Sequence, residues 1–252
     1  MGGESGESES SSEEADESSD SSSAGSDSQD ATSDSGEASS TADEATSADE
    51  AGDGDSAGDG DGDATSAESG GEPGSLDLSI LIATDDAEEN EAGEVVTVST
   101  DLELVDDPMT WGSNQVVGIR FQVVNIPAAA TITSARLDFT VDEPTSEATD
   151  LLVQAQSGAD PLTFSEGNGD ITSRPRTNAS VSWYDVPPWP EIGFVQSSPD
   201  LSPLVQELVD APGWTSGQSL VFLVTGTGAR VATAYDGNPT ASTGLHIEWV
   251  GP

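Results

Sequence analysis

From about residue 76 onward, apolar and polar residues alternate along the chain. Val117, Ile119, Phe121 and Val123 fall on one face of such a segment, and residues 135–141 and 245–249 repeat the pattern. A period of two with one apolar face is typical of a half-buried β-strand. Turn sequences separate the further strands, which are predicted at 78–83, 94–99, 101–105, 151–156, 180–185, 219–225 and 229–235.

One segment departs from this alternation and predicts a helix. Leucine and valine residues between positions 201 and 209 form an apolar stripe at helical spacing. Asp200 or Ser202 is placed to cap the start of this helix, and Ala211-Pro212-Gly213 ends it. Many strands with one short helix predict an all-β fold, a two-sheet antiparallel β-sandwich of the jelly-roll type.

The first 75 residues carry no such pattern. Apart from Met1 and Pro73 they contain no hydrophobic side chain larger than alanine, and they hold 23 acidic residues with no Lys, Arg or His. Such a segment lacks the apolar area that offsets backbone ordering entropy, and its unrelieved negative charge extends it. We therefore expect a disordered acidic tether over residues 1–75 and one folded domain over residues 76–252.

The domain is acidic as well, with 26 acidic residues against five Arg and no Lys. This charge argues against nucleic acid and anionic lipid as partners, because both require a positive field on the protein. The chain has no Cys and no apolar run long enough to span a membrane. Its Gly/Ser/acidic tether resembles the spacer that follows the lipidated Cys of mature bacterial lipoproteins. The resemblance implies a bacterial extracellular or cell-surface location, with membrane attachment only through an N-terminal lipid.

Several longer segments of the domain carry a second resemblance. They include DDAEE, VVGIRFQVVNIPAAATITSARLDFTVDE, SPDLSPLVQELVDAPGW and SLVFLVTGTGARVATAYDG, in this order along residues 80–250. The domain resembles a β-sandwich module of secreted marine and myxobacterial proteins, similar to carbohydrate-binding-module-like jelly rolls of the DNRLRE type. This resemblance implies a noncatalytic accessory or adhesion domain whose partner is a polysaccharide or extracellular matrix.

The acidic cluster Asp85, Asp86, Glu88 and Glu89 is the candidate metal site. Calcium takes six to eight oxygen ligands, and carboxylates gathered at a strand end supply several of them. Jelly-roll binding modules often carry a structural calcium near the first strand, so the resemblance implies that role for these four residues. The alternative is a solvated acidic surface in a chain that is acidic throughout.

Aromatic residues are scarce, so their positions are informative. Trp183, Tyr184 and Trp189 lie in SWYDVPPWPE, a proline-rich loop that can hold rings exposed for stacking on sugars. Arg174 and Arg176 form the one local positive spot and are candidates for hydrogen bonds to hydroxyl or uronate groups. In the alternative interpretation, the two tryptophans close one end of the core and the arginines pair with nearby carboxylates.

Catalysis has little support in the sequence. His246 is the sole histidine, and no G-x-S-x-G segment surrounds any serine. We therefore expect a noncatalytic extracellular binding or adhesion module on a flexible spacer, with polysaccharide as ligand and calcium as cofactor. A structural cell-surface or stalk protein that binds a protein partner or itself is the alternative. A polysaccharide hydrolase that uses paired carboxylates is a third hypothesis.

Overall fold

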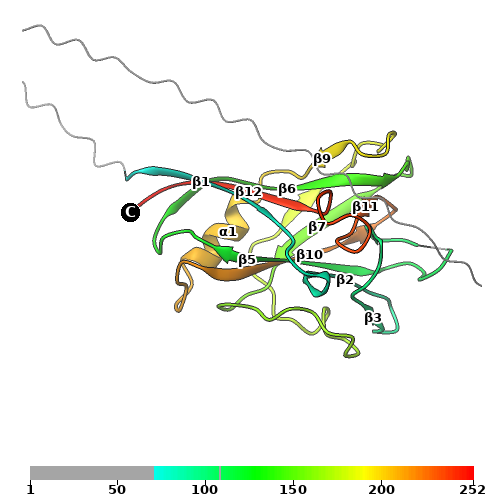
Figure 1. The fold of residues 1–252 in the computed structure, drawn as a ribbon, viewed down its shortest axis with the longest axis horizontal. Helices are drawn as coiled ribbons and strands as arrows, with labels where there is room; N and C mark the ends of the chain where they lie inside the picture. Colours follow the sequence, from blue (N-terminus) through cyan, green and yellow to red (C-terminus); the bar gives the residue numbers. More distant parts are fainter. Residues whose placement is uncertain (1–70, 108) are drawn as a thin grey trace, which may run out of the picture. The chain divides into compact units, whose positions relative to one another are not determined.

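The computed structural model describes residues 71–107 and 109–252, so nearly all of the predicted tether lies outside the described residues. Within them, two antiparallel sheets pack face to face with one α-helix at the side (Figure 1). The predicted two-sheet antiparallel β-sandwich with one short helix is confirmed.

Sheet 1 contains the first and last strands of the fold. Its order is β1 (Pro73–Ser79), β12 (Gly244–Val250), β6 (Thr131–Glu143), β11 (Val231–Thr233) and β4 (Asp101–Glu103), with β9 (Val195–Ser197) also paired to β6. Pro73 stands opposite Val250, so the start of β1 and the end of β12 lie side by side (Figure 1). The predicted domain boundary at residue 76 therefore falls inside β1.

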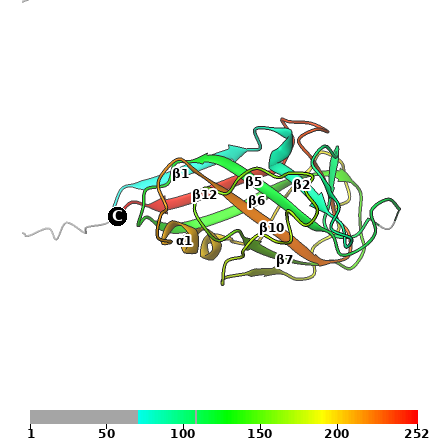
Figure 2. The same ribbon diagram turned by 90° about the horizontal axis from the view of Figure 1, so that it is seen from below.

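Sheet 2 has the order β3 (Val95–Val96), β2 (Asp86–Glu89), β5 (Val116–Val124), β10 (Gln218–Thr227), β7 (Asp150–Ala155) and β8 (Val181–Trp183). A short 3-10 turn, η1 (Ala83–Asp85), leads into β2. Figure 2 shows β10 running between β5 and β7. Neither β2 nor β9 was predicted from the sequence.

The main core lies between the two sheets. Inward residues of β5, β10 and β6, such as Ile119, Phe222 and Leu137, are fully buried there. The helix α1 (Ser202–Val209) packs against β6 through the predicted stripe, and Pro203 occupies its first turn. No helix among the described residues is long and apolar enough to cross a membrane.

The outer face of sheet 2 is also covered. Residues 156–178, which we call the covering loop, run across this face and bury Phe164 and Ile171 against Ala87, Val221 and Leu223. Gly118 on β5 leaves room for the Phe164 ring, because a Cβ at this position would stand 2.5 Å from the ring atom Cζ. The part of sheet 2 beneath the covering loop is thus buried on both faces, and polar side chains there must find partners within the protein.

Candidate functional site

The four acidic residues of the predicted metal site lie at and just before β2, an extended strand. Asp86 and Glu88 stand opposite Ile119 and Val117, which face the core between the sheets. Successive side chains of a strand point to opposite faces, so Asp85 and Glu89 lie on the outer face instead. The expectation that all four carboxylates gather at one site is wrong, because a strand separates them into two pairs.

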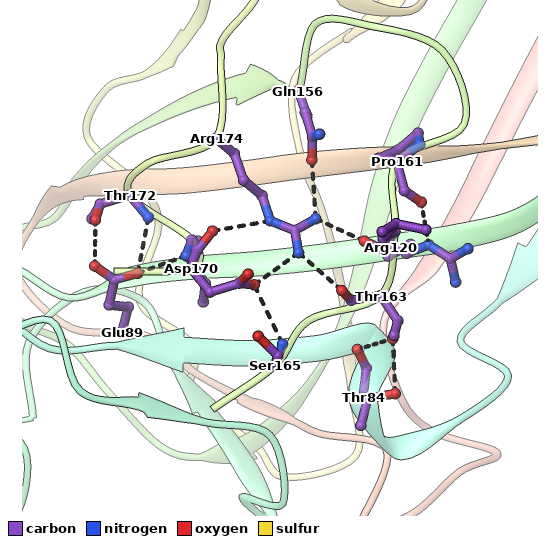
Figure 3. Close-up of polar contacts among 12 residues, drawn as sticks. Thr84, Glu89, Arg120, Gln156, Pro161, Thr163, Ser165, Asp170, Thr172 and Arg174 are labelled. Atoms are coloured by element: carbon purple, nitrogen blue, oxygen red, sulfur yellow. Dashed lines mark hydrogen bonds and ion pairs between the residues drawn. The ribbon is translucent and has the colours of Figure 1, made fainter. Parts of the chain in front are cut away.

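The outer pair anchors the covering loop and its neighbours. Asp85 accepts hydrogen bonds from Arg120 and Gln122, each at 2.6 Å, and from Thr163 at 2.9 Å. Glu89 accepts the backbone N–H groups of Ile171 and Thr172 at 2.7 and 2.9 Å and also the Thr172 hydroxyl (Figure 3). These carboxylates are satisfied by protein donors, so they hold the loop against sheet 2.

Arg174 completes the anchorage of the covering loop. A guanidinium has five N–H donors, and all five are used here at 2.8–3.1 Å. Its acceptors are the carbonyls of Leu162, Thr163 and Asp170 and the side chains of Gln156 and Asp170 (Figure 3). Arg174 therefore has no free N–H donor for the predicted ligand contact, because all five already donate to acceptors in the covering loop.

Arg176 differs from its neighbour. Its side chain is half-buried, and its Nη1 atom is enclosed without a hydrogen-bond partner. Burial lowers the pKa of Arg176, and the charge of Glu89 opposes that shift. Of the two arginines singled out from the sequence, Arg176 alone retains an unused donor.

The charged neighbours of the inner pair, Asp86 and Glu88, are other carboxyl groups. Burial raises the pKa of Asp86 to about 7, even though the backbone N–H of Tyr235 donates to its Oδ2 at 2.7 Å. Burial and the adjacent Glu103 carboxyl raise the pKa of Glu88 well above its usual range. The pKa of Glu103 itself is raised, again mainly by burial. Burial disfavours the charged form of a carboxyl group. Carboxyl groups buried in this way therefore favour binding of a proton or a cation.

A second acidic group lies nearby on sheet 1. One carboxylate oxygen from each of Asp101, Asp142 and Glu143 falls within 4.8 Å of the other two. Ser99 donates to Asp101, and Thr233 donates to Asp142, each at 3.2 Å. The three side chains are half-buried or exposed, so water competes with any cation for them.

The predicted aromatic platform is largely core. Trp183 and Trp189 are buried and pack on Phe139 with ring centroids 6.3 and 5.9 Å apart. The two tryptophans therefore close one end of the sandwich, where they cover apolar side chains of the core. This agrees with the alternative interpretation of the sequence. The expectation that these two rings stand exposed for a ligand is wrong.

Tyr184 differs from the two tryptophans, because 71% of the residue is exposed to solvent. It follows Trp183 at the end of β8, where alternation directs it to the outer face of sheet 2. Tyr184 borders an open depression of about 360 Å³. Asp150, Leu151, Leu152, Ser182, Gly226 and Thr227 form the rest of the lining.

Sequence reasoning missed the polar rim of this depression and one buried amide. Asp150, Ser182 and Thr227 come from three different strands, and a single sequence does not show that pairing of β7 with β8 and β10 joins them. Gln115 is fully buried, and neither atom of its amide has a partner. A signal for Gln115 existed, since the inward alternation of Val117 and Ile119 extends back to it.

Neither a protein-family model nor a curated protein matches this chain.

Proposed function

We propose that the domain is a noncatalytic binding module whose ligand is a polysaccharide held at the β7–β8 edge of sheet 2. The observation that carries this proposal is the exposed ring of Tyr184 beside an open depression with a polar rim. An aromatic face matches the C–H face of a sugar ring, and hydroxyl and carboxylate groups at its border match the sugar hydroxyls. Asp150, Ser182 and Thr227 supply these groups.

The chemistry of the depression supports a chain-like ligand. The depression is open to solvent, so a polymer can lie across it without an end being enclosed. Asp150 is already positioned, because one of its oxygens accepts the backbone N–H of Asp185 at 2.8 Å. A carboxylate fixed in this way orients its remaining lone pairs at low entropic cost.

The acidic tether belongs to the same proposal. In this proposal the predicted tether, residues 1–75, serves as a spacer between the module and a bacterial cell surface, a use that its charged, Gly/Ser-rich composition supports. The spacer composition supports an extracellular location and an N-terminal lipid as the link to the membrane.

Retention of the full chain on a panel of immobilised polysaccharides tests the proposed ligand class. Tyr184→Ala removes the stacking face, and loss of such an anchor weakens binding about tenfold or more. Phe194→Ala is the matched control, because Phe194 is exposed but lies at β9, in the other sheet. No retention on any polysaccharide, or equal retention by wild type and Tyr184→Ala, would contradict the proposal.

One feature favours the alternative of a structural surface protein that associates with protein. Ile192, Phe194 and Val195 are each more than half exposed, and they lie at or beside the short strand β9. Adjacent exposed apolar side chains on a sheet edge favour pairing with another chain. Sedimentation velocity over a range of concentrations distinguishes this function: assembly that Phe194→Ser abolishes would support it.

A further inference from the structure

Tyr184 and Asp150 are neighbours on the outer face of sheet 2. Leu151 pairs with Trp183, so the next residues outward along these two antiparallel strands, Asp150 and Tyr184, stand opposite each other. On the other side of β7, Thr227 of β10 pairs with Asp150. Residues that stand opposite each other in this way share one face of the sheet. A ring, a carboxylate and a hydroxyl therefore form one row across three strands.

The side chains that line the depression around this row offer hydrogen-bond acceptors and no cation. Its polar side chains are the carboxylate of Asp150 and the hydroxyls of Ser182, Tyr184 and Thr227. A carboxylate only accepts hydrogen bonds, and a hydroxyl accepts as well as donates. A uronate or sulfate group would find no Lys or Arg in the lining to balance its charge.

Asp150 keeps one carboxylate oxygen for a ligand. Its Oδ1 accepts the backbone N–H of Asp185 at 2.8 Å, and its Oδ2 has no partner among the described residues. Asp150 and Asp185 are both exposed, so they place two negative charges at the border of the depression. A carboxylate held in this way is ready to accept a hydrogen bond from a cation, and such charge-assisted bonds are among the stronger ones in proteins.

Two arginines lie in this part of the domain, and neither lines the depression. Arg230 is 1% exposed, so a ligand cannot reach its guanidinium. Its donors are used by the carbonyls of Glu147, Val186, Pro187 and Ala229 and by the Thr149 hydroxyl. Arg176 stands opposite Gln156, which lies four residues beyond Leu152 along the chain, or about 13 Å at the rise of a strand.

The charge of the whole chain acts in the same direction as the charge of the depression. The chain has 49 acidic residues against five Arg, which gives a formal net charge of −44. A field of this sign attracts cationic partners and repels polyanions. The lining and the net charge therefore favour the same class of polysaccharide, one that carries positive charge.

We propose that the ligand at this depression is a polysaccharide with free amino sugars, an inference that rests on the proposed saccharide site and specifies its ligand. An ammonium group has three N–H donors and no acceptor, which matches the carboxylate of Asp150 and the hydroxyls of Ser182 and Thr227. The ring of Tyr184 stacks on the C–H face of the sugar and also attracts the ammonium group through its π face. Acetylation of the amine removes the charge and keeps the sugar ring, so the site distinguishes two forms of one polymer.

Calorimetric titration of the full chain with short glucosamine oligomers, at about 0.15 M salt, tests the proposal. N-acetylated oligomers of the same length are the reference, and we expect the free-amine form to bind about tenfold more tightly. Asp150→Asn keeps an acceptor for the Asp185 N–H but removes the charge, so it abolishes this preference. Tyr184→Ala weakens binding of both forms. Glu166→Gln, which removes an exposed carboxylate from the covering loop, is the matched control and keeps the wild-type preference.

The acidic tether and surface also attract polycations without a specific site, and a cation without sugar rings addresses this explanation. Oligolysine of the same length carries ammonium groups only, so it should bind more weakly than the glucosamine oligomer and equally to wild type and Tyr184→Ala. Oligolysine that binds as tightly as the glucosamine oligomer overturns the proposal, and so does a wild-type preference in Asp150→Asn. Equal or tighter binding of acetylated or uronate oligomers that Tyr184→Ala weakens overturns the amino-sugar assignment alone. If no saccharide of any charge binds, the proposed function fails with it.

Discussion

Val123 has a φ angle of 57°, a value that β-branched residues rarely adopt. It lies on β5 where the register with β10 shifts, so that Gln122 and Val123 both stand opposite Ser219. A bulge of this kind normally places glycine at the position with positive φ, because glycine has no Cβ to clash. The Val123 side chain is half exposed, so little packing offsets the strain.

Val123→Gly is therefore expected to stabilise the domain. Relief of left-handed strain gains about 1–2 kcal/mol, and the greater freedom of glycine in the unfolded chain returns about 0.5–1 kcal/mol. The net gain of about 1 kcal/mol corresponds to a rise in Tm of roughly 2–4 °C, measurable by calorimetry. Val98→Gly is the control: Val98 is exposed but is not among the residues with positive φ, so glycine there gives no gain. A lower Tm for Val123→Gly would show that the side chain contributes packing that outweighs the strain.

At the same scale, the sequence predicted the chemistry of individual side chains better than their surroundings. The acidic run at 85–89 was recognised, but with Ala87 as its one apolar residue it shows no alternation that would predict a strand. Their partners lie far along the chain, at Arg120, Glu103, Thr172 and Tyr235. Only tertiary packing brings those donors together, so no local pattern indicated which carboxylates were satisfied.

Among the elements, the covering loop is the one whose stability depends most on polar contacts. It has no regular strand or helix of its own between β7 and β8, and it buries two large apolar side chains, Phe164 and Ile171. Arg174 lies over the Phe164 ring at 4.3 Å from its centroid and bonds to both arms of the loop. The loop is therefore fixed largely by side-chain hydrogen bonds, those of Arg174 together with those accepted by Asp85 and Glu89, rather than by a regular strand ladder.

Arg174→Lys is expected to release the covering loop although it keeps the charge. Lysine offers three donors from one point, so several of the buried acceptors lose their partner. Breaking a buried charged network in this way costs about 3–5 kcal/mol, which urea unfolding measures. Hydrogen exchange should become faster at residues 163–173 while β5 and β10 stay protected. Arg136→Lys, at an exposed ion pair with Asp138, should change stability by less than about 0.5 kcal/mol. Unaltered exchange in the loop of Arg174→Lys would contradict this role.

The elements that the sequence predicted well are the long ones. Strands β6 and β12 and the helix α1 follow their apolar periodicity, because one face of each meets the core. Strand β5 follows it only as far as Phe121; the bulge then exposes Val123, which the alternation had placed on the inward face, and buries Val124 instead. Strand β1 begins earlier than expected, within a Pro-Gly-Ser segment. There Trp249 lies against Gly74, where a Cβ would stand 2.4 Å from the ring atom Cε2. A cross-strand aromatic residue thus makes a strand out of a segment that reads as linker, and a single sequence does not reveal such a pairing.

For the whole molecule, acidity acts in two different ways. Exposed carboxylates repel one another weakly through water and salt. Asp86 and Glu88 are buried and the adjacent Glu103 is half-buried, so their ionisation also costs hydration free energy. All three have raised pKa values, with burial as the main cause. Asp200 and Glu207 have lowered pKa values despite the opposing effect of burial, because hydrogen bonds favour their charged forms. These two residues stabilise the fold above the usual carboxylate range and lose that contribution only in acid.

The buried carboxyl group of Asp86 predicts that the domain loses stability as pH rises from 5 to 8. The pKa of Asp86 is about 7 when folded against 3.8 as its ordinary value, so the folded state binds more protons between these values. Stability is then fully present below the ordinary value and falls as pH rises through about 7, by a few kcal/mol. Urea unfolding in chelator at pH 5, 6, 7 and 8 measures the slope. Asp86→Asn, which keeps an acceptor for the Tyr235 N–H, should flatten the profile and be the more stable protein at pH 8. Glu166→Gln, on the exposed surface of the covering loop, should keep the wild-type slope. Stability that is constant or rises over this range would show that the buried carboxyl groups are already neutralised by something other than protons.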